Sequence, residues 1–122
     1  MIAYCSPTDG KPLSAESDAL VSPSGQRYPI VRGIPRFVPE NNYAAAFGLQ
    51  WKTFTKTQLD SHSTLDITRE RLIRCLGAPL SSLKGKTVLE VGCGAGRFTE
   101  LLVESGALTH SVDLSNAVEA NL

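Results

Sequence analysis

The chain has 122 residues, of which 42% are hydrophobic and 20% charged, and its 12 basic and 12 acidic side chains leave no net charge. This composition is that of a globular protein, and it carries no dense basic run of the kind that binds nucleic acid. The first residues lack the features of a signal peptide, and no apolar stretch approaches the roughly 18 residues that span a bilayer. We therefore expect a cytoplasmic protein that contacts neither nucleic acid nor membrane. Its three cysteines, an odd and widely spaced number, do not suggest a disulfide framework.

Residues 1–40 are rich in proline, glycine and serine, with short apolar pieces between turns. The segment "YPIVRGIPRFVP" (28–39) indicates two short extended segments broken at Arg32 and Gly33. Each proline in it pushes the preceding residue towards extended geometry. The pattern predicts a small β-rich subdomain of hairpins over residues 1–40.

Residues 41–85 have the character of a helical region that links two others. A helix over 41–59, capped by Asn41 or Asn42, would carry four rings at spacings of four, four and three. Those spacings put the rings on one helical face. We expect this face to pack into the core; the sharper alternative is that some rings also wall a ligand pocket. The four rings are those of Tyr43, Phe47, Trp51 and Phe54.

A second helix is predicted over residues 64–77, with Thr64 or Asp66 as its cap and Gly77 as its stop signal. A partial apolar face runs along it. Its members are Ile67, Leu72, Cys75 and Leu76. Because no histidine or other base is patterned around it, we expect Cys75 to be a small core residue rather than a nucleophile.

Residues 86–122 follow a strand, loop, helix, strand order. The expected elements are a strand over 87–91, a glycine loop over 92–96, a helix over 97–105 ending at Gly106, and a strand over 109–112. Asp113 ends the second strand, and Ser115 caps a further helix. This is a βαβ unit with parallel strands, which makes the fold class α/β.

The glycine spacing decides which cofactor the loop suits. A glycine loop between strand and helix lets a ligand approach the backbone, and helix N–H groups favour anionic or polar ligand atoms. A dinucleotide turn needs G-x-G-x-x-G. Here Gly92 and Gly94 fit, but the third position is the long side chain of Arg97. The glycines instead recur as G-x-G-x-G, which disfavours a pyrophosphate-binding turn of the NAD kind.

"LEVGCGAGRFT" followed by "HSVDLS" resembles the first two motifs of the Rossmann-type S-adenosylmethionine-dependent methyltransferases. The resemblance matches Glu90 and the three glycines to the motif E/D-x-G-x-G-x-G, whose loop embraces the methionine part of the cofactor. It implies that Glu90 favours the ammonium group and that Asp113 holds the ribose hydroxyls. A carboxylate can accept two hydrogen bonds from such a diol. The implied S-adenosylmethionine site comprises Glu90, Gly92, Cys93, Gly94, Gly96, Asp113 and Leu114.

The upstream segment "YPIVRGIPRFVPE" is similar to the end of a zinc-ribbon-like domain that precedes some methyltransferase domains. A structural zinc needs four cysteine or histidine ligands. Cys5 is the single cysteine of residues 1–40, so we expect a degenerate ribbon without metal. "FGLQWKTFTKTQLDS" (47–61) resembles a segment of a subgroup that modifies small molecules or glycans, which implies an acceptor of that kind.

The resemblance implies a sheet of seven strands, of which residues 86–122 supply two. We therefore expect the chain to be the N-terminal βαβ part of a truncated methyltransferase domain, folded but inactive by itself, and able to self-associate through an exposed sheet edge. No catalytic base is assigned, since His62 and His110 are expected to be ordinary exposed or packed histidines. Two alternatives stay open: a noncatalytic interaction module that retains the signature, and a nucleotide-dependent oxidoreductase, which Arg97 disfavours.

Overall fold

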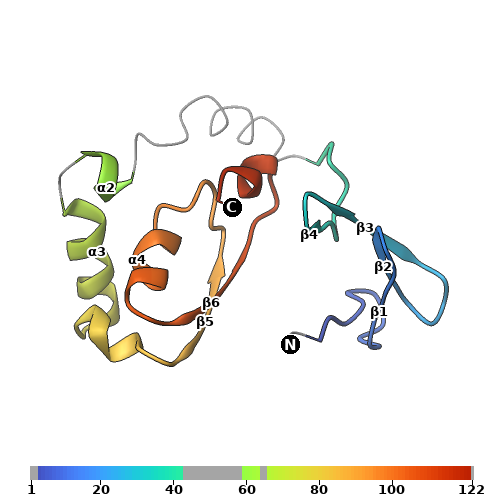
Figure 1. The fold of residues 1–122 in the computed structure, drawn as a ribbon, viewed down its shortest axis with the longest axis horizontal. Coiled ribbons are helices and arrows are strands. Elements are labelled where there is room, and N and C mark those ends of the chain that lie inside the picture. Colours follow the sequence, from blue (N-terminus) through green and yellow to red (C-terminus); the bar gives the residue numbers. More distant parts are fainter. Residues whose placement is uncertain (1–2, 43–58, 64–65, 122) are drawn as a thin grey trace. The chain divides into compact units, whose positions relative to one another are not determined.

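The structure, a computed structural model, describes residues 3–42, 59–63 and 66–121. The chain divides into two compact units, Met1–Pro39 and Glu40–Leu122 (Figure 1). The predicted helix over 41–59 falls almost entirely outside the described residues, and so do its four aromatic side chains. No helix in the described ranges is long and apolar enough to cross a membrane.

The first unit is an antiparallel sheet in the order β1-β2-β3-β4. Its strands are β1 (Ser14–Ala15), β2 (Ala19–Val21), β3 (Arg27–Val31) and β4 (Ile34–Pro35). The last two are joined by Arg32 and Gly33, both with positive φ, at 52° and 78°. Two consecutive positive φ angles are the signature of the tight hairpin turn that matches strand twist. The predicted pair of extended segments broken at these residues is confirmed.

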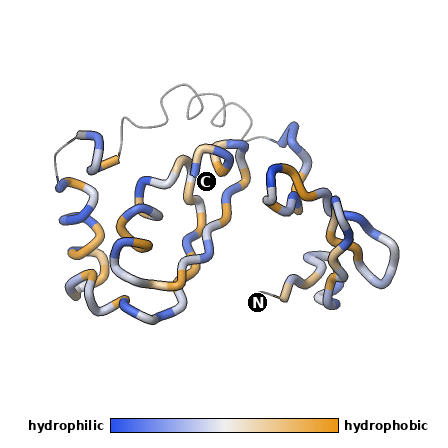
Figure 2. The backbone as a smooth tube through the Cα atoms, in the orientation of Figure 1, coloured by the Kyte–Doolittle hydropathy of each residue, from blue (hydrophilic) through white to orange (hydrophobic). Residues whose placement is uncertain are grey.

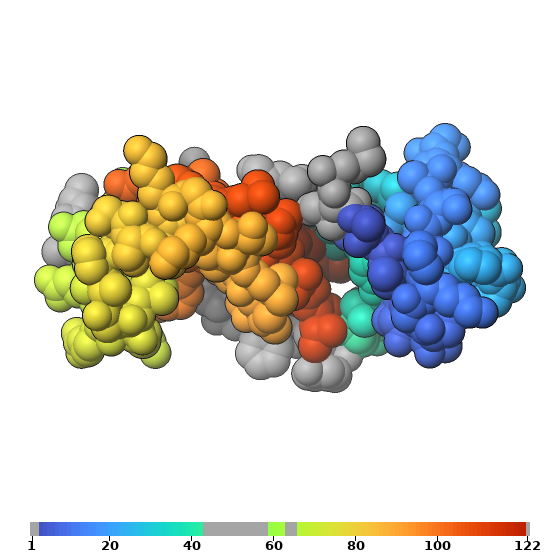
Figure 3. Space-filling view, turned by 90° about the horizontal axis from the view of Figure 1, so that it is seen from below, coloured from blue at the N-terminus to red at the C-terminus, as the bar shows by residue number. Residues whose placement is uncertain are grey.

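A small core of rings and short side chains holds the first unit together. Tyr28 is buried at 4% exposure, and its ring centroid lies 5.1 Å from that of Phe37. Its hydroxyl is 3.2 Å from that of the buried Ser6, so its polar end is also satisfied. Figure 3 shows the atoms of this unit in blue to cyan. Cys5 is exposed, and no described residues form a group of three or more potential metal ligands.

The second unit is built on two parallel strands, β5 (Thr87–Val91) and β6 (Leu108–Val112), joined through the helix α4 (Thr99–Glu104). Their register runs from Thr87 opposite Leu108 to Val91 opposite Val112. The predicted strand, helix, strand order and the parallel pairing are confirmed. The helix is shorter than expected, because the residues from Gly94 to Phe98 form turns rather than its first turn.

The core of the second unit lies where α4, the short helix η1 (Leu80–Leu83) and the strands meet. Its buried members are Leu80, Leu83, Leu101 and Leu102, and Leu72, Val88 and Ala107 pack against it. The helix α3 (Ile67–Leu76) lies beside α4 (Figure 1). Figure 2 shows hydrophobic positions recurring along the strands and on α4.

One face of the two strands is left open in the described part of the chain. Alternate residues on this face are strongly exposed: Leu89 by 66%, Val91 by 76%, Leu108 by 60% and Val112 by 48%. The intervening residues Val88, Glu90 and Ser111 are half-buried. Only the second set therefore lies on the side that α4 covers.

The predicted apolar face of α3 is wrong for three of its four members. Cys75 is exposed, as are Ile67 and Leu76, and only Leu72 packs against the core. The buried residue of the helix is instead Thr68, at 1% exposure. The most buried side chain of α3 is polar, so the hydrophobic pattern of the helix predicted the wrong face to be buried. Gly77 ends the helix in the left-handed conformation, as predicted.

The N-terminal amides of α3 are capped from an earlier turn of the chain. Asp60, in the short helix α2 (Asp60–Ser63), accepts hydrogen bonds from the N–H groups of Thr68 (3.1 Å) and Arg69 (2.8 Å). Asp66, one of the two predicted caps, makes no such bond, and Thr64 lies outside the described residues. Burial on its own raises the pKa of Asp60, but the hydrogen bonds from Thr68 and Arg69 and the nearby charge of Arg97 outweigh it and lower the pKa.

We predict that Asp60→Ala lowers the free energy of unfolding by about 1 kcal/mol at pH 7, the usual cost of removing a helix cap. The matched control is Asp66→Ala, which removes only an exposed ion pair with Arg69 and should change stability little. Because the folded pKa of Asp60 lies below its ordinary value of 3.8, its contribution is complete at neutral pH and is lost as the pH falls below that value. Urea unfolding at pH 7 and pH 3 measures both effects; equal losses for the two variants would contradict the assignment.

Candidate functional site

The candidate site lies where the carboxyl ends of β5 and β6 meet. Since the strands are parallel and in register, the loop after β5 and the residues after β6 emerge at the same edge. The carbonyl of Val112 accepts hydrogen bonds from the N–H groups of Gly92 (2.8 Å) and Cys93 (3.1 Å). The start of the glycine loop is thus bound to the end of β6.

Asp113 extends this connection through its side chain. One carboxylate oxygen accepts from the N–H of Gly94 at 2.7 Å. The other accepts from the N–H and the hydroxyl of Ser115 at 2.7 and 2.6 Å. A carboxylate offers roughly four acceptor positions, and Asp113 is only half-buried. It can therefore brace the loop and still accept a hydrogen bond from a ligand hydroxyl.

The three glycines of the loop all have positive φ, but their surroundings differ. A Cβ built on Gly92 (φ 79°) or Gly94 (φ 53°) would meet nothing within 4 Å. Gly96 (φ 98°) is buried, and a Cβ there would overlap the side-chain amide of Asn121. The first two glycines leave the backbone open to a ligand, whereas the third allows another segment of the chain to approach closely.

Glu90 is held by two hydroxyl groups from neighbouring elements. Its Oε2 accepts from Thr99 at 2.5 Å and from Ser111 at 2.8 Å. Sequence reasoning singled out Glu90 but missed both of its partners. A faint signal existed for Ser111, because the register of the two parallel strands places it directly opposite Glu90, on the same face of the sheet.

The two remaining predicted site residues lie at the same edge in different settings. Cys93 is 4% exposed, and burial raises the pKa of its thiol. It therefore remains protonated at neutral pH, which fits a small packed residue better than a nucleophile. Leu114 exposes 47% of its surface, and its carbonyl accepts from the side-chain amide of Asn42 at 2.6 Å.

The predicted cap at Ser115 is confirmed, although the element it begins is a 3-10 helix, η2 (Asn116–Ala120). The Ser115 hydroxyl accepts from the N–H of Ala117. This short helix carries Asn121 at its C-terminal end, which brings that side chain to the glycine loop.

Arg97, which follows the loop, is directed to α3. Its Nε donates to the hydroxyl of Thr68 at 3.1 Å, and its guanidinium carbon lies 5.7 Å from the centroid of the Phe98 ring. Since the N–H of Thr68 bonds to Asp60, polar contacts join the loop, α3 and the cap of α3. The long side chain that disfavours a dinucleotide turn thus has a structural role.

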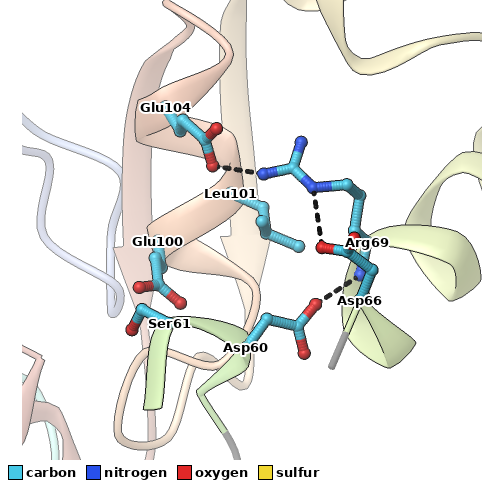
Figure 4. Close-up of a pocket in the computed structure, with 7 residues that line it drawn as sticks. All are labelled: Asp60, Ser61, Asp66, Arg69, Glu100, Leu101 and Glu104. Carbon is cyan, nitrogen blue, oxygen red and sulfur yellow. Dashed lines mark hydrogen bonds and ion pairs between the residues drawn. The ribbon is translucent and has the colours of Figure 1, made fainter. Parts of the chain in front are cut away.

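A hollow of about 300 Å³ lies between α2, α3 and α4, and its lining residues are outside the glycine loop (Figure 4). It is lined by Asp60, Ser61, Asp66, Arg69, Glu100, Leu101 and Glu104. Arg69 donates to Glu104 at 2.6 Å and lies 3.5 Å from Asp66. The pair with Glu104 joins α3 to α4, whereas the pair with Asp66 lies within α3 and its N-terminal cap, so we interpret the hollow as part of the packing of the two helices.

Comparison with known proteins finds similarity to O-methyltransferases over short stretches. The chain is 32% identical over 62 residues to O-methyltransferase rstn1 of Aspergillus nomiae, 51% of this chain and 26% of that protein. It is 49% identical over 37 residues to the ubiquinone biosynthesis O-methyltransferase of Coxiella burnetii, 30% of this chain and 16% of that protein. It is 38% identical over 55 residues to O-methyltransferase resE of Aspergillus sclerotiorum, 45% of this chain and 19% of that protein.

All three of these matches are to proteins named as O-methyltransferases, and each covers a short part of the relative. The chain spans between 16% and 26% of the length of these curated relatives. No family model matches it.

We predict that Gly96→Ala destabilises the chain by about 2 kcal/mol, because an alanine would be strained at φ 98° and would also displace Asn121. The matched control is Gly94→Ala, where φ is 53° and the surrounding space is open, so the loss should be about half as large. Urea unfolding of both variants checks the difference. Equal destabilisation would mean that the contact with Asn121 does not contribute.

Proposed function

We propose that the chain is part of a Rossmann-type methyltransferase and that the edge shared by β5 and β6 binds S-adenosylmethionine. One observation carries the proposal. The open glycine loop and the carboxylate of Asp113 lie together at the carboxyl ends of adjacent parallel strands, joined by the bond from Gly94 to Asp113. In open α/β sheets, this edge is where ligands bind.

Each group at this edge suits one part of that ligand. Gly92 and Gly94 offer a backbone without Cβ contacts to the methionine part. Asp113 has acceptor capacity left for the ribose hydroxyls, and Glu90 supplies a negative charge for the ammonium group. The bound cofactor would supply the electrophilic methyl group, and the residues of this chain would hold it in place. The similarity to O-methyltransferases favours a hydroxyl oxygen of a small-molecule or glycan-type compound as the acceptor.

The competing proposal, a dinucleotide-dependent oxidoreductase, is weakened by the contacts of Arg97. A pyrophosphate turn needs a small third residue so that helix and strand pack closely. Here the side chain at that position extends to Thr68 and lies over Phe98. Replacing it by glycine would break the link between the loop and α3.

The binding proposal is tested by titrating the isotopically labelled chain with S-adenosylmethionine while following the amide resonances of residues 92–96. We expect shifts that saturate and are confined to this loop and to residues near Asp113. NADH at the same concentrations is the control ligand and should produce smaller shifts. Tighter binding of NADH, or no response to S-adenosylmethionine, would refute the proposal.

We predict that Asp113→Ala weakens binding of S-adenosylmethionine by about 1–3 kcal/mol, the cost of leaving a polar group without its partner. Because Asp113 also braces the loop, the control is Ser115→Ala, which removes one hydroxyl bond to the same carboxylate and the cap of η2 but leaves the carboxylate in place. That control should bind nearly as well as the wild type. Calorimetry or the same titration measures both affinities, and an unchanged affinity for Asp113→Ala would exclude the ribose role.

A further inference from the structure

A chain of three polar side chains runs from η2 to the predicted cofactor site. The side-chain amide of Asn121 donates to the hydroxyl of Thr99 at 2.8 Å, and that hydroxyl lies 2.5 Å from Oε2 of Glu90. Ser111 donates to the same oxygen at 2.8 Å. With Ser111 the network has four members, which come from β5, β6, α4 and the C-terminal cap of η2.

The direction of each hydrogen bond in this chain is determined by simple proton counting. A hydroxyl carries one hydrogen, and a carboxylate can only accept. The short contact with Glu90 therefore uses the hydrogen of Thr99, which leaves the Thr99 oxygen as an acceptor for Asn121. The distance of 2.5 Å falls in the range of hydrogen bonds to an ionised oxygen.

This arrangement fixes one carboxylate oxygen of Glu90 by hydrogen bonds and leaves the other available to a ligand. Two hydroxyl donors converge on Oε2, whereas Oε1 forms no hydrogen bond within the described residues. The rotation of the carboxylate is thus set by Thr99 and Ser111. Asn121 is in turn fixed by its close approach to Gly96, which has no side chain in the way.

We infer that Thr99 and Asn121 are positioning residues that orient the carboxylate of Glu90 towards the ammonium group of the cofactor's methionine part. The inference rests on the proposed function, and it adds two residues to the proposed site and says how each one acts on Glu90. Thr99 acts directly on Glu90, and Asn121 acts through Thr99. Neither residue needs to touch the cofactor.

The test compares two ligands that differ in the part Glu90 would recognise. S-Adenosylhomocysteine carries the amino-acid group, whereas 5′-methylthioadenosine has the same nucleoside and sulfur without it. We expect Thr99→Val to weaken binding of S-adenosylhomocysteine about tenfold, equivalent to about 1.4 kcal/mol, and to leave 5′-methylthioadenosine within twofold of the wild type. Asn121→Leu should act in the same direction with a smaller effect, and Thr99→Ser should restore binding.

Thr109→Val is the matched control, because its hydroxyl is buried and has no hydrogen-bond partner among the described residues. It should bind both ligands as the wild type does. Amide spectra report whether each variant folds. If Thr99→Val does not fold, the comparison of the two ligands is made with Asn121→Leu. Equal weakening of both ligands, or no weakening of either, would overturn the inference. A wild-type chain that binds neither ligand would instead refute the proposed function, on which the inference rests.

Discussion

The parallel pairing of β5 with β6 is the constraint on which the rest of the second unit depends. Its register sets Val91 opposite Val112, so the loop and Asp113 leave the sheet at the same level. A slip of one residue would turn every side chain to the other face. Glu90 would then leave α4 and lose Thr99 and Ser111, and Asp113 would no longer reach the N–H of Gly94. The register of the two strands therefore determines how the glycine loop, Glu90 and Asp113 are placed relative to one another.

The same register creates a polar layer between the strands and α4, where an apolar core would be expected. Glu90, Thr99 and Ser111 occupy this layer, while Val88, on the same face of β5, packs against the leucine cluster of η1 and α4. A carboxylate in such a place is tolerated only if it is hydrogen-bonded. Two hydroxyls satisfy that need through one oxygen. Polar side chains here take the place of apolar contacts and hold a charge at the edge of the sheet. Such a charge is useful where a ligand binds.

The sequence was sufficient for local features and insufficient for contacts between distant segments. The two strands, the glycine loop and the stop at Gly77 follow from short patterns, and the structure has them all. The role of Asp60 at the start of α3 was missed because this side chain reaches the helix from a separate turn, eight residues before Thr68. Cys75 was misassigned because the burial of a helix face depends on which neighbour it meets. The contact of Asn121 with Gly96, 25 residues apart, leaves no local trace in either segment.

The three glycines of the loop show how one spacing can serve two physical needs. Gly92 and Gly94 have open space beside them, so their value is a backbone that turns with positive φ and admits a ligand. Gly96 is closed by Asn121, so its value is a close approach between segments of the chain. In a dinucleotide-binding turn the third glycine stands one position later than Gly96, and it allows the helix to pack closely against the strand. Here that later position is Arg97, whose side chain joins the loop to Thr68. Shifting the third glycine by one residue thus exchanges close helix packing for a polar connection to α3, and it leaves the first two glycines free for the ligand.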